Sequence, residues 1–244
     1  MPYLNFIDDE NLIDAVKHVL DIARKAKSSA ATKFHSNVID PFGAFFEAGG
    51  FKLSHEAWRN NEEARQAQKT VQNHVGAFHQ KILGSVKGWE DLSVGGNVDL
   101  RCENRKIIAE IKNKYSTVTG AKLVNEYQSL ERLIMPKASI YWGYTAYFVN
   151  IIPNKPACID KEFTPSDKDK GTKCTANEKI RIIDGASFYD LATNQKGSLK
   201  ALYNVLPQVI EDTYKTYYPE ENFTLEGKEL FSKYFAMAYG DNHD

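Results

Sequence analysis

The run of residues 106–115, KIIAEIKNKY, constrains the fold of this chain more than any other segment. Its aliphatic content predicts a β-strand buried in a sheet. Glu110 and Lys112 interrupt it two residues apart, so both side chains project from one face of the strand while Ile111 points to the other. A carboxylate and an ammonium on an apolar strand are costly to desolvate unless they bind a partner. The run therefore predicts a binding or catalytic site on one face of a sheet.

A second strand-like run, residues 97–103, precedes the first and is joined to it by the tight connection Asn104-Arg105. If the two runs pair as a hairpin, Asp99 approaches Glu110 from the side. Two carboxylates and the carbonyl of Ile111 then form an oxygen site that suits Mg²⁺. The neighbouring lysine is placed to hold an attacking water or to stabilise charge on phosphorus. This grouping suits the hydrolysis of a phosphodiester.

Periodic apolar residues outline the rest of the chain. Helices are expected at residues 9–28, 40–51, 54–84, 121–134, 187–193 and 198–217. Further strands are expected at residues 141–152 and 179–183, separated by a polar, exposed excursion at residues 154–178. This order predicts an α/β (α+β mixed) fold, a central mixed β-sheet flanked by helices. We expect one domain over residues 1–244, with a helical part at about 1–90 and a catalytic core at about 91–217.

Composition narrows the class of protein. The chain has 244 residues, of which 42% are hydrophobic and 26% charged, as is usual for a globular protein. It contains no apolar run of the roughly 18 residues that a membrane span needs, and its N-terminus does not resemble a signal peptide. Its three cysteines are widely spaced, which favours reduced thiols over a disulfide framework or a zinc cluster. We therefore expect a cytoplasmic protein with no membrane partner.

The charge balance alone does not identify a partner. A net charge of −1, from 31 Lys and Arg against 32 Asp and Glu, is not that of a strongly basic nucleic-acid binder. The charges are unevenly distributed, because residues 101–122 carry six basic and two acidic side chains, whereas residues 210–244 carry eight acidic and three basic ones. A local positive surface around the predicted site is compatible with phosphate binding.

Asp99, ten intervening residues and then Glu110-Ile111-Lys112 resemble the PD-(D/E)xK nuclease motif, with Val98 where that motif has proline. A closer resemblance covers about residues 36–217. Four segments are similar to a family of Type II restriction endonucleases that includes enzymes cutting GGNCC or GGWCC sites: HQKILGSVKGWEDL (79–92), AEIKNKYSTVTG (109–120), YWGYTAYFVNIIP (141–153) and IIDGASFYDLAT (182–193).

The resemblance implies a Mg²⁺-dependent enzyme that cuts double-stranded DNA at a short G/C-rich palindrome. It implies that Asp99 and Glu110 are metal ligands and that Lys112 is the catalytic lysine. A palindromic site suits a homodimer, because two-fold protein symmetry matches two-fold DNA symmetry. A DNA methyltransferase that protects host DNA is the expected partner in such a system.

Other polar residues are candidates for supporting roles. Three that directly follow the catalytic strand are expected near the scissile strand, where they can contact phosphate or a base edge: Asn113, Lys114 and Tyr115. Three on the 54–84 helix can hold the DNA backbone: Arg65, Lys69 and Gln72. Either Glu47 or Gln80 can complete the active site. For each of these residues, a plain solvated surface is the alternative interpretation.

Two further interpretations concern the aromatic strand and the reaction. The aromatic side chains at residues 141–148 are expected to pack in the core rather than to stack on bases. The alternatives to a restriction enzyme are another nuclease on the same fold, for repair or junction cleavage, a DNA-binding protein that does not cut, and a two-carboxylate glycosidase that uses Asp99 and Glu110.

Overall fold

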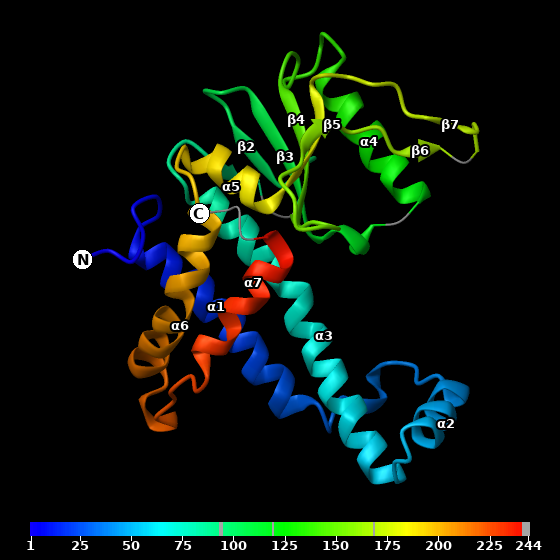
Figure 1. Ribbon diagram of the computed structural model, residues 1–244, viewed down its shortest axis with the longest axis vertical. Helices are drawn as coiled ribbons and strands as arrows, with labels where there is room; N and C mark the ends of the chain where they lie inside the picture. Colours follow the sequence, from blue (N-terminus) through cyan, green and yellow to red (C-terminus); the bar gives the residue numbers. More distant parts are fainter. Residues whose placement is uncertain (93–94, 119, 168, 241–244) are drawn as a thin grey trace.

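The computed structural model describes residues 1–92, 95–118, 120–167 and 169–240. Thr119, in the AEIKNKYSTVTG segment, and Lys168, in the polar excursion, lie outside the described residues. A group of long helices lies beside a mixed sheet that has helices on both faces (Figure 1). The predicted fold class is confirmed. None of the helices in the described part of the chain combines the length and the apolar character needed to cross a bilayer.

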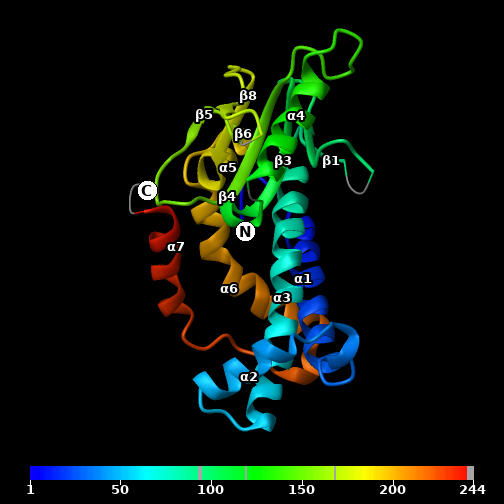
Figure 2. The ribbon, with the colours of Figure 1, turned by 90° about the vertical axis from the view of Figure 1, so that its right-hand side faces the viewer.

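Long helices form the part of the molecule farthest from the sheet. α1 (Asp9–Ser29) and α3 (His55–Gly84) run side by side, and α6 (Ser198–Tyr217) packs on α1 (Figures 1 and 2). The short helix α2 (Pro41–Gly50) lies at the outer end of α3. These four helices confirm the predictions for residues 9–28, 40–51, 54–84 and 198–217.

Capping residues explain where two of these helices begin. The Ser54 hydroxyl accepts a hydrogen bond from the backbone N–H of Ala57 at 3.2 Å, as expected for the residue before α3. The Asp40 carboxylate accepts from the N–H groups of Phe42 and Gly43 at 3.0 and 3.1 Å, which fixes the start of α2.

The sheet has the strand order β1-β2-β3-β4-β8-β5. β1 (Glu90–Asp91), β2 (Leu100–Cys102) and β3 (Ile107–Lys114) pair antiparallel in turn, which confirms the predicted hairpin. β3, β4 (Thr145–Ile152) and β8 (Ile180–Asp184) are parallel, and β5 (Asp160–Glu162) pairs antiparallel with β8 at the edge. A separate ribbon pairs β6 (Ser166–Asp167) with β7 (Thr172–Lys173).

One face of the sheet is covered by α4 (Ala121–Ile134). Tyr127 and Leu130 of this helix pack with Ile108 of β3 and Phe148 of β4. The helix has the bounds that the sequence predicts. It therefore lies over the face of β3 from which Glu110 and Lys112 project.

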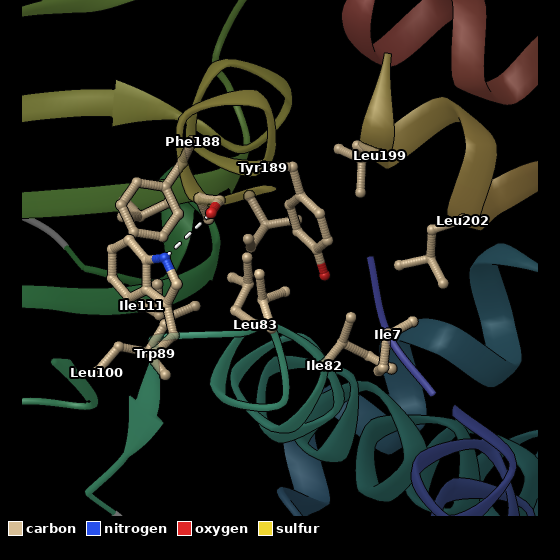
Figure 3. Packing of buried hydrophobic residues seen from close by; sticks show 14 of the residues in the cluster. Ile7, Ile82, Leu83, Trp89, Leu100, Ile111, Phe188, Tyr189, Leu199 and Leu202 are labelled. Carbon is tan, nitrogen blue, oxygen red and sulfur yellow. Dashed lines mark hydrogen bonds between the residues drawn. The ribbon is translucent and has the colours of Figure 1, made fainter. Parts of the chain in front are cut away.

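The opposite face is covered by α5 (Gly185–Thr193) and the inner end of α3. Trp89 lies here beside Leu100 and Phe188, and its indole N–H donates to the carbonyl of Ala192 at 3.1 Å (Figure 3). Ile111 belongs to the same buried cluster, as its alternation with Glu110 predicts. The two faces of β3 thus have different roles, one in the core and one at the site.

Four short 3-10 helices complete the described chain: η1 (Phe34–Ser36), η2 (Tyr115–Thr117), η3 (Pro219–Glu221) and η4 (Lys228–Phe231). After η4 the chain forms α7 (Ser232–Tyr239), which lies beyond the predicted elements.

Two predicted strand boundaries and one predicted exposure are wrong. The aromatic strand begins at Thr145 rather than at residue 141, because the chain turns at Gly143, whose φ of +80° a strand does not accommodate. Trp142 in that turn is 55% exposed, whereas the other aromatic residues of the run are buried. The polar excursion is not wholly exposed, because β5 joins the sheet and Phe163 is buried. The strand predicted at residues 97–103 is shorter in the structure, where β2 spans only Leu100–Cys102.

Candidate active site

The β2–β3 hairpin brings Asp99 to β3, the strand that carries Glu110 and Lys112. Its backbone N–H donates to the carbonyl of Ala109 at 3.1 Å, so Asp99 continues the ladder one residue before β2 begins. Its carboxylate turns onto β3 and accepts a hydrogen bond from the N–H of Ile111 at 2.6 Å. Asp99 is therefore fixed beside the Glu110-Ile111-Lys112 segment, eleven residues away in the sequence but one strand away in space.

Lys112 lies between two carboxylates on the α4 side of the sheet. Its ammonium nitrogen is 2.7 Å from Oε1 of Glu110 on the same strand and 3.1 Å from Oε1 of Glu126 on α4. All three side chains are partly buried. The packing of Tyr127 and Leu130 holds α4 against this face of the sheet, and so fixes Glu126 over the strand.

The site contains more carboxylates than cationic groups. Burial raises the pKa of Asp99 above its usual value. Burial also raises the pKa of Glu110, and the negative charge of Asp99 raises it further. Burial alone would lower the pKa of Lys112, but the contacts with Glu110 and Glu126 outweigh it, so that this pKa is raised and the lysine stays charged. The cluster has an excess of negative charge that a cation would relieve.

Gln80 reaches the site from α3. Its side-chain amide donates to a carboxylate oxygen of Asp91 at 2.8 Å and lies 3.5 Å from the carbonyl oxygen of Asp99. Glu47, the other accessory candidate, is not brought to the site. It lies on α2 at the outer end of α3, where its carboxylate accepts from the indole N–H of Trp58 at 3.0 Å.

The three residues after Lys112 do not share one surface. Lys114 is exposed on the face of Lys112, and Tyr115 is exposed at the start of η2. Asn113 points to the opposite face, where it borders a hollow of about 500 Å³ lined mainly by apolar side chains of α1, α3, α6 and α7. Its Oδ1 is buried and has no hydrogen-bond partner among the described residues. The geometry therefore separates Asn113 from the site face.

The α3 candidates lie in a row leading away from the site. Gln72 is exposed and borders the hollow, and Lys69 is exposed. Arg65 pairs with the buried carboxylate of Glu62 at 2.5 Å, which lowers the pKa of Glu62. At 1.5 Å per residue, Arg65 lies about 22 Å along the helix from Gln80. These residues do not contact the catalytic cluster.

Comparison with known proteins identifies the enzyme class. The profile of the family described as Eco47II restriction endonuclease matches residues 4–215. This chain belongs to that family. It is 54% identical to the Type II restriction enzyme Eco47II of Escherichia coli over 240 residues, which cover 98% of this chain and 100% of the relative. It is 31% identical to the Type II restriction enzyme Sau96I of Staphylococcus aureus over 244 residues, which cover 98% of this chain and 91% of that relative.

The resemblance stated from the sequence is thereby confirmed, and this member of the Eco47II family is a site-specific restriction endonuclease that acts on double-stranded DNA. Family membership sets aside the glycosidase, the non-cutting DNA-binding protein and the repair or junction nuclease. Type II restriction endonucleases are generally metal-dependent, so the site is expected to offer ligands for a metal ion.

The donor set of this family member fits a hard divalent cation. Asp99 and Glu110 supply two carboxylates, and Ile111, directly after Glu110 in the chain, supplies a backbone carbonyl. No group of three or more His, Cys, Asp or Glu side chains gathered for a metal occurs in the described ranges. Mg²⁺ does not require three such side chains, because it usually keeps several waters and also binds substrate phosphate oxygens. Two carboxylates and one carbonyl are therefore a sufficient set of protein ligands.

Sequence reasoning missed two acids near the site, Glu126 and Asp91. Glu126 occurs three residues after Leu123 and four before Leu130, within the apolar stripe of α4. A charged residue in such a stripe is a signal that the sequence offers. Asp91 lies on the two-residue strand β1, which is too short to be recognised from its sequence pattern.

Proposed function

We propose that this restriction endonuclease uses Mg²⁺ and cuts a short G/C-rich palindrome of the GGNCC type, with Asp99 and Glu110 as metal ligands and Lys112 as the catalytic lysine. One observation carries the assignment of the residues. Asp99 is hydrogen-bonded to the strand segment that bears Glu110 and Lys112, and the lysine is held between two carboxylates at 2.7 and 3.1 Å. The motif resemblance and this geometry point to the same three residues.

Each residue has a role in phosphodiester hydrolysis. Asp99, Glu110 and the Ile111 carbonyl would hold Mg²⁺, which supplies charge neutralisation at the phosphoryl oxygens and a more acidic water. The ammonium of Lys112 donates hydrogen bonds to the attacking water or to the phosphoryl oxygen that gains charge. Water attacks phosphorus in line and releases a proton to solvent, the P–O3′ bond breaks, and the departing O3′ takes up a proton from solvent. The products carry a 5′-phosphate and a 3′-hydroxyl.

Exposed polar side chains near the site and on α3 are candidates for further contacts with the DNA. We assign Lys114 and Tyr115 to the DNA next to the scissile phosphate, because both are exposed where β3 ends and η2 begins. Lys69 and Gln72 on α3 are assigned to the DNA backbone farther from the site, and Arg65 contributes there while it is paired with Glu62. We also propose that the enzyme is a homodimer and that a DNA methyltransferase protects its sites in the host.

The test is cleavage of plasmid DNA with Mg²⁺, followed by sequencing of the ends. Discrete fragments that share one short palindrome are expected. Asp99→Ala and Lys112→Ala should each abolish cutting while DNA binding, measured in Ca²⁺, is retained. Lys173→Ala, at an exposed lysine on β7 outside the basic segment 101–122, is the matched control and should cut normally. Normal cutting by Lys112→Ala would refute the assignment.

A further inference from the structure

The short helix α2 presents a large apolar surface to solvent. Its sequence and the residue after it, PFGAFFEAGGF, include four phenylalanines that expose 71–82% of their surface: Phe42, Phe45, Phe46 and Phe51. None of the ten residues of α2, all of which the structure describes, is buried. The helix lies at the outer end of α3, far from the sheet (Figures 1 and 2). An amphipathic helix in a globular protein normally buries its apolar side, so α2 lacks the packing that such a side requires.

Polar contacts nevertheless hold α2 in a fixed position. Asp40 caps its first turn, and Glu47, the one charged residue in its sequence, turns back to accept a hydrogen bond from Trp58 of α3 at 3.0 Å. A helix of ten residues is too short to be stable alone, because isolated helices under about 12–15 residues are marginal in water. The contacts with α3 therefore orient α2 so that its uncharged, aromatic side faces outward.

We propose that this aromatic side of α2 is the surface on which a second copy of the chain docks, α2 against α2. The inference rests on the proposed cleavage of a palindrome, which needs one active site for each DNA strand. At roughly 200 Å² for an aromatic side chain, the four phenylalanines expose about 600 Å² in each copy. Two copies would bury about 1,200 Å², which is the lower end of the range for stable protein interfaces.

The chemistry of the surface favours a second copy over DNA. DNA binding depends on neutralising phosphates with basic side chains. The α2 helix contains no Lys or Arg. An uncharged aromatic face is complementary to itself, so the same patch on two copies forms an isologous contact with two-fold symmetry.

The length of α3 fixes how the two copies are arranged. This helix has 30 residues and begins beside α2, and Gln80 lies about 38 Å along it from its first residue. If the two α3 helices ran in opposite directions from the contact, the active sites would lie about 75 Å apart. A five-base-pair site spans only about 17 Å at 3.4 Å per base pair. The two α3 helices therefore run in the same direction, with the α2 pair at the closed end and both active sites at the open end.

The mass of the protein in solution tests this surface independently of cleavage. By light scattering, the unaltered protein should have the mass of two chains. Phe45→Glu with Phe46→Glu should give single chains, and so should Phe45→Lys with Phe46→Lys, because like charges would meet across the contact. Ile140→Glu, at a residue 76% exposed in the loop between α4 and β4, is the matched control and should stay dimeric. Circular dichroism should show unchanged folding, because the replaced side chains are exposed.

Mixing the two charge variants gives the decisive result. In a face-to-face contact, the glutamate variant should pair with the lysine variant and restore the mass of two chains. On supercoiled plasmid, each variant alone should lose concerted double-strand cutting, and the mixture should regain it. Single chains that persist in the mixture would overturn the α2–α2 contact. A monomeric unaltered protein would overturn it as well. So would glutamate variants that remain dimeric but lose DNA binding. A dimeric protein that cuts no DNA would instead refute the proposed function and leave the surface intact.

Discussion

Lys112, the proposed catalytic lysine, is held by contacts from two elements. Glu110 reaches it along β3 and Glu126 reaches it from α4, at 2.7 and 3.1 Å. A lysine has a flexible four-carbon stem, so a single contact leaves its ammonium free to rotate. The second contact restricts it. Glu126 is therefore a positioning residue for Lys112.

Glu126→Gln is expected to lower the single-turnover rate of DNA cleavage roughly 10–100-fold, the range found for residues that orient a catalytic group. DNA binding in Ca²⁺ and the unfolding midpoint should change little, since the substitution preserves size. Glu131→Gln is the matched control, because Glu131 lies on the same helix but accepts a hydrogen bond from Tyr127 at 3.1 Å, away from the lysine. If both variants slowed cleavage equally, the positioning role of Glu126 would be wrong.

His79 should make the stability of the protein sensitive to acid. Burial lowers its pKa from 6.5 to about 4, and its Nδ1 shares a hydrogen bond with the Tyr189 hydroxyl at 2.8 Å. Because the pKa is lower in the folded state, the unfolded chain binds more protons between these values. The stabilisation is thus fully present above pH 6.5 and lost as the pH falls toward 4, by up to about 3 kcal/mol.

Urea unfolding measured from pH 7 to pH 4.5 checks this expectation. His79→Gln removes the titrating group, so its free energy of unfolding should fall less over this range than that of the unaltered protein. His35→Gln, at an exposed histidine, should keep the original slope. Parallel pH profiles for the His79 variant and the unaltered protein would contradict the prediction.

At the scale of elements, the junction between β8 and α5 is the closest approach that any described glycine makes to another part of the chain. A Cβ added to Gly185 would lie 2.4 Å from the carbonyl oxygen of Ile151 and 2.7 Å from its Cα. Both atoms belong to the backbone of β4, which cannot move without disturbing the parallel pairing on either side. Glycine is therefore required for α5 to start directly against the strand.

Gly185→Ala is expected to destabilise the fold by about 1–3 kcal/mol, the usual cost of overpacking, and to lower the thermal midpoint. Gly76→Ala in α3 is the matched control. A Cβ there would meet only the Cβ of Asn113 at an ordinary 3.6 Å. Alanine is favoured over glycine inside a helix by about 1 kcal/mol, so the control should be neutral or more stable. An unchanged midpoint for Gly185→Ala would show that β4 yields more easily than we infer.

The elements that sequence predicts well are those whose pattern is long. The helices at residues 54–84 and 121–134 show repeated apolar spacing and clear ends, and the structure matches them closely. β5 was missed because three polar residues, Asp-Lys-Glu, carry no alternation. It becomes a strand only because the edge of β8 offers unpaired backbone groups. That information is tertiary, and no local pattern contains it.

β3, which carries the proposed catalytic residues, was predictable from its long apolar pattern, whereas the elements around it were not. Glu110 and Lys112 interrupt a strong apolar run, so their shared face follows from alternation alone. Glu126 joins them only through the packing of α4, and Asn113 turns away because the strand alternates toward the hollow beneath. The sequence motif thus predicted the residues on one strand, and the fold added those from other elements.

At the scale of the whole molecule, a single buried cluster joins the helical part to the sheet. It contains Leu12 of α1 and Ile82 of α3 together with Val149 of β4 and Phe188 of α5 (Figure 3 shows its centre). The helical part and the catalytic core therefore cannot separate without exposing apolar surface from both. This supports the proposal that residues 1–244 form one domain, although the long helices extend well beyond the sheet.

A domain whose helical part and sheet share one buried cluster should unfold in one step. Calorimetry is expected to show a single transition whose calorimetric and van't Hoff enthalpies agree, allowing for two chains if the dimer persists.

Leu12→Ala and Val149→Ala are the informative pair of variants. Both residues are fully buried, Leu12 in the helical part and Val149 in the sheet. Large-to-small changes in a core cost about 1–5 kcal/mol. Each variant should shift the same transition downward as a whole, with helix content and tryptophan fluorescence lost together. If Leu12→Ala instead splits the transition, with an early step that leaves the fluorescence of Trp89 unchanged, the helices unfold separately and the catalytic core is a domain of its own.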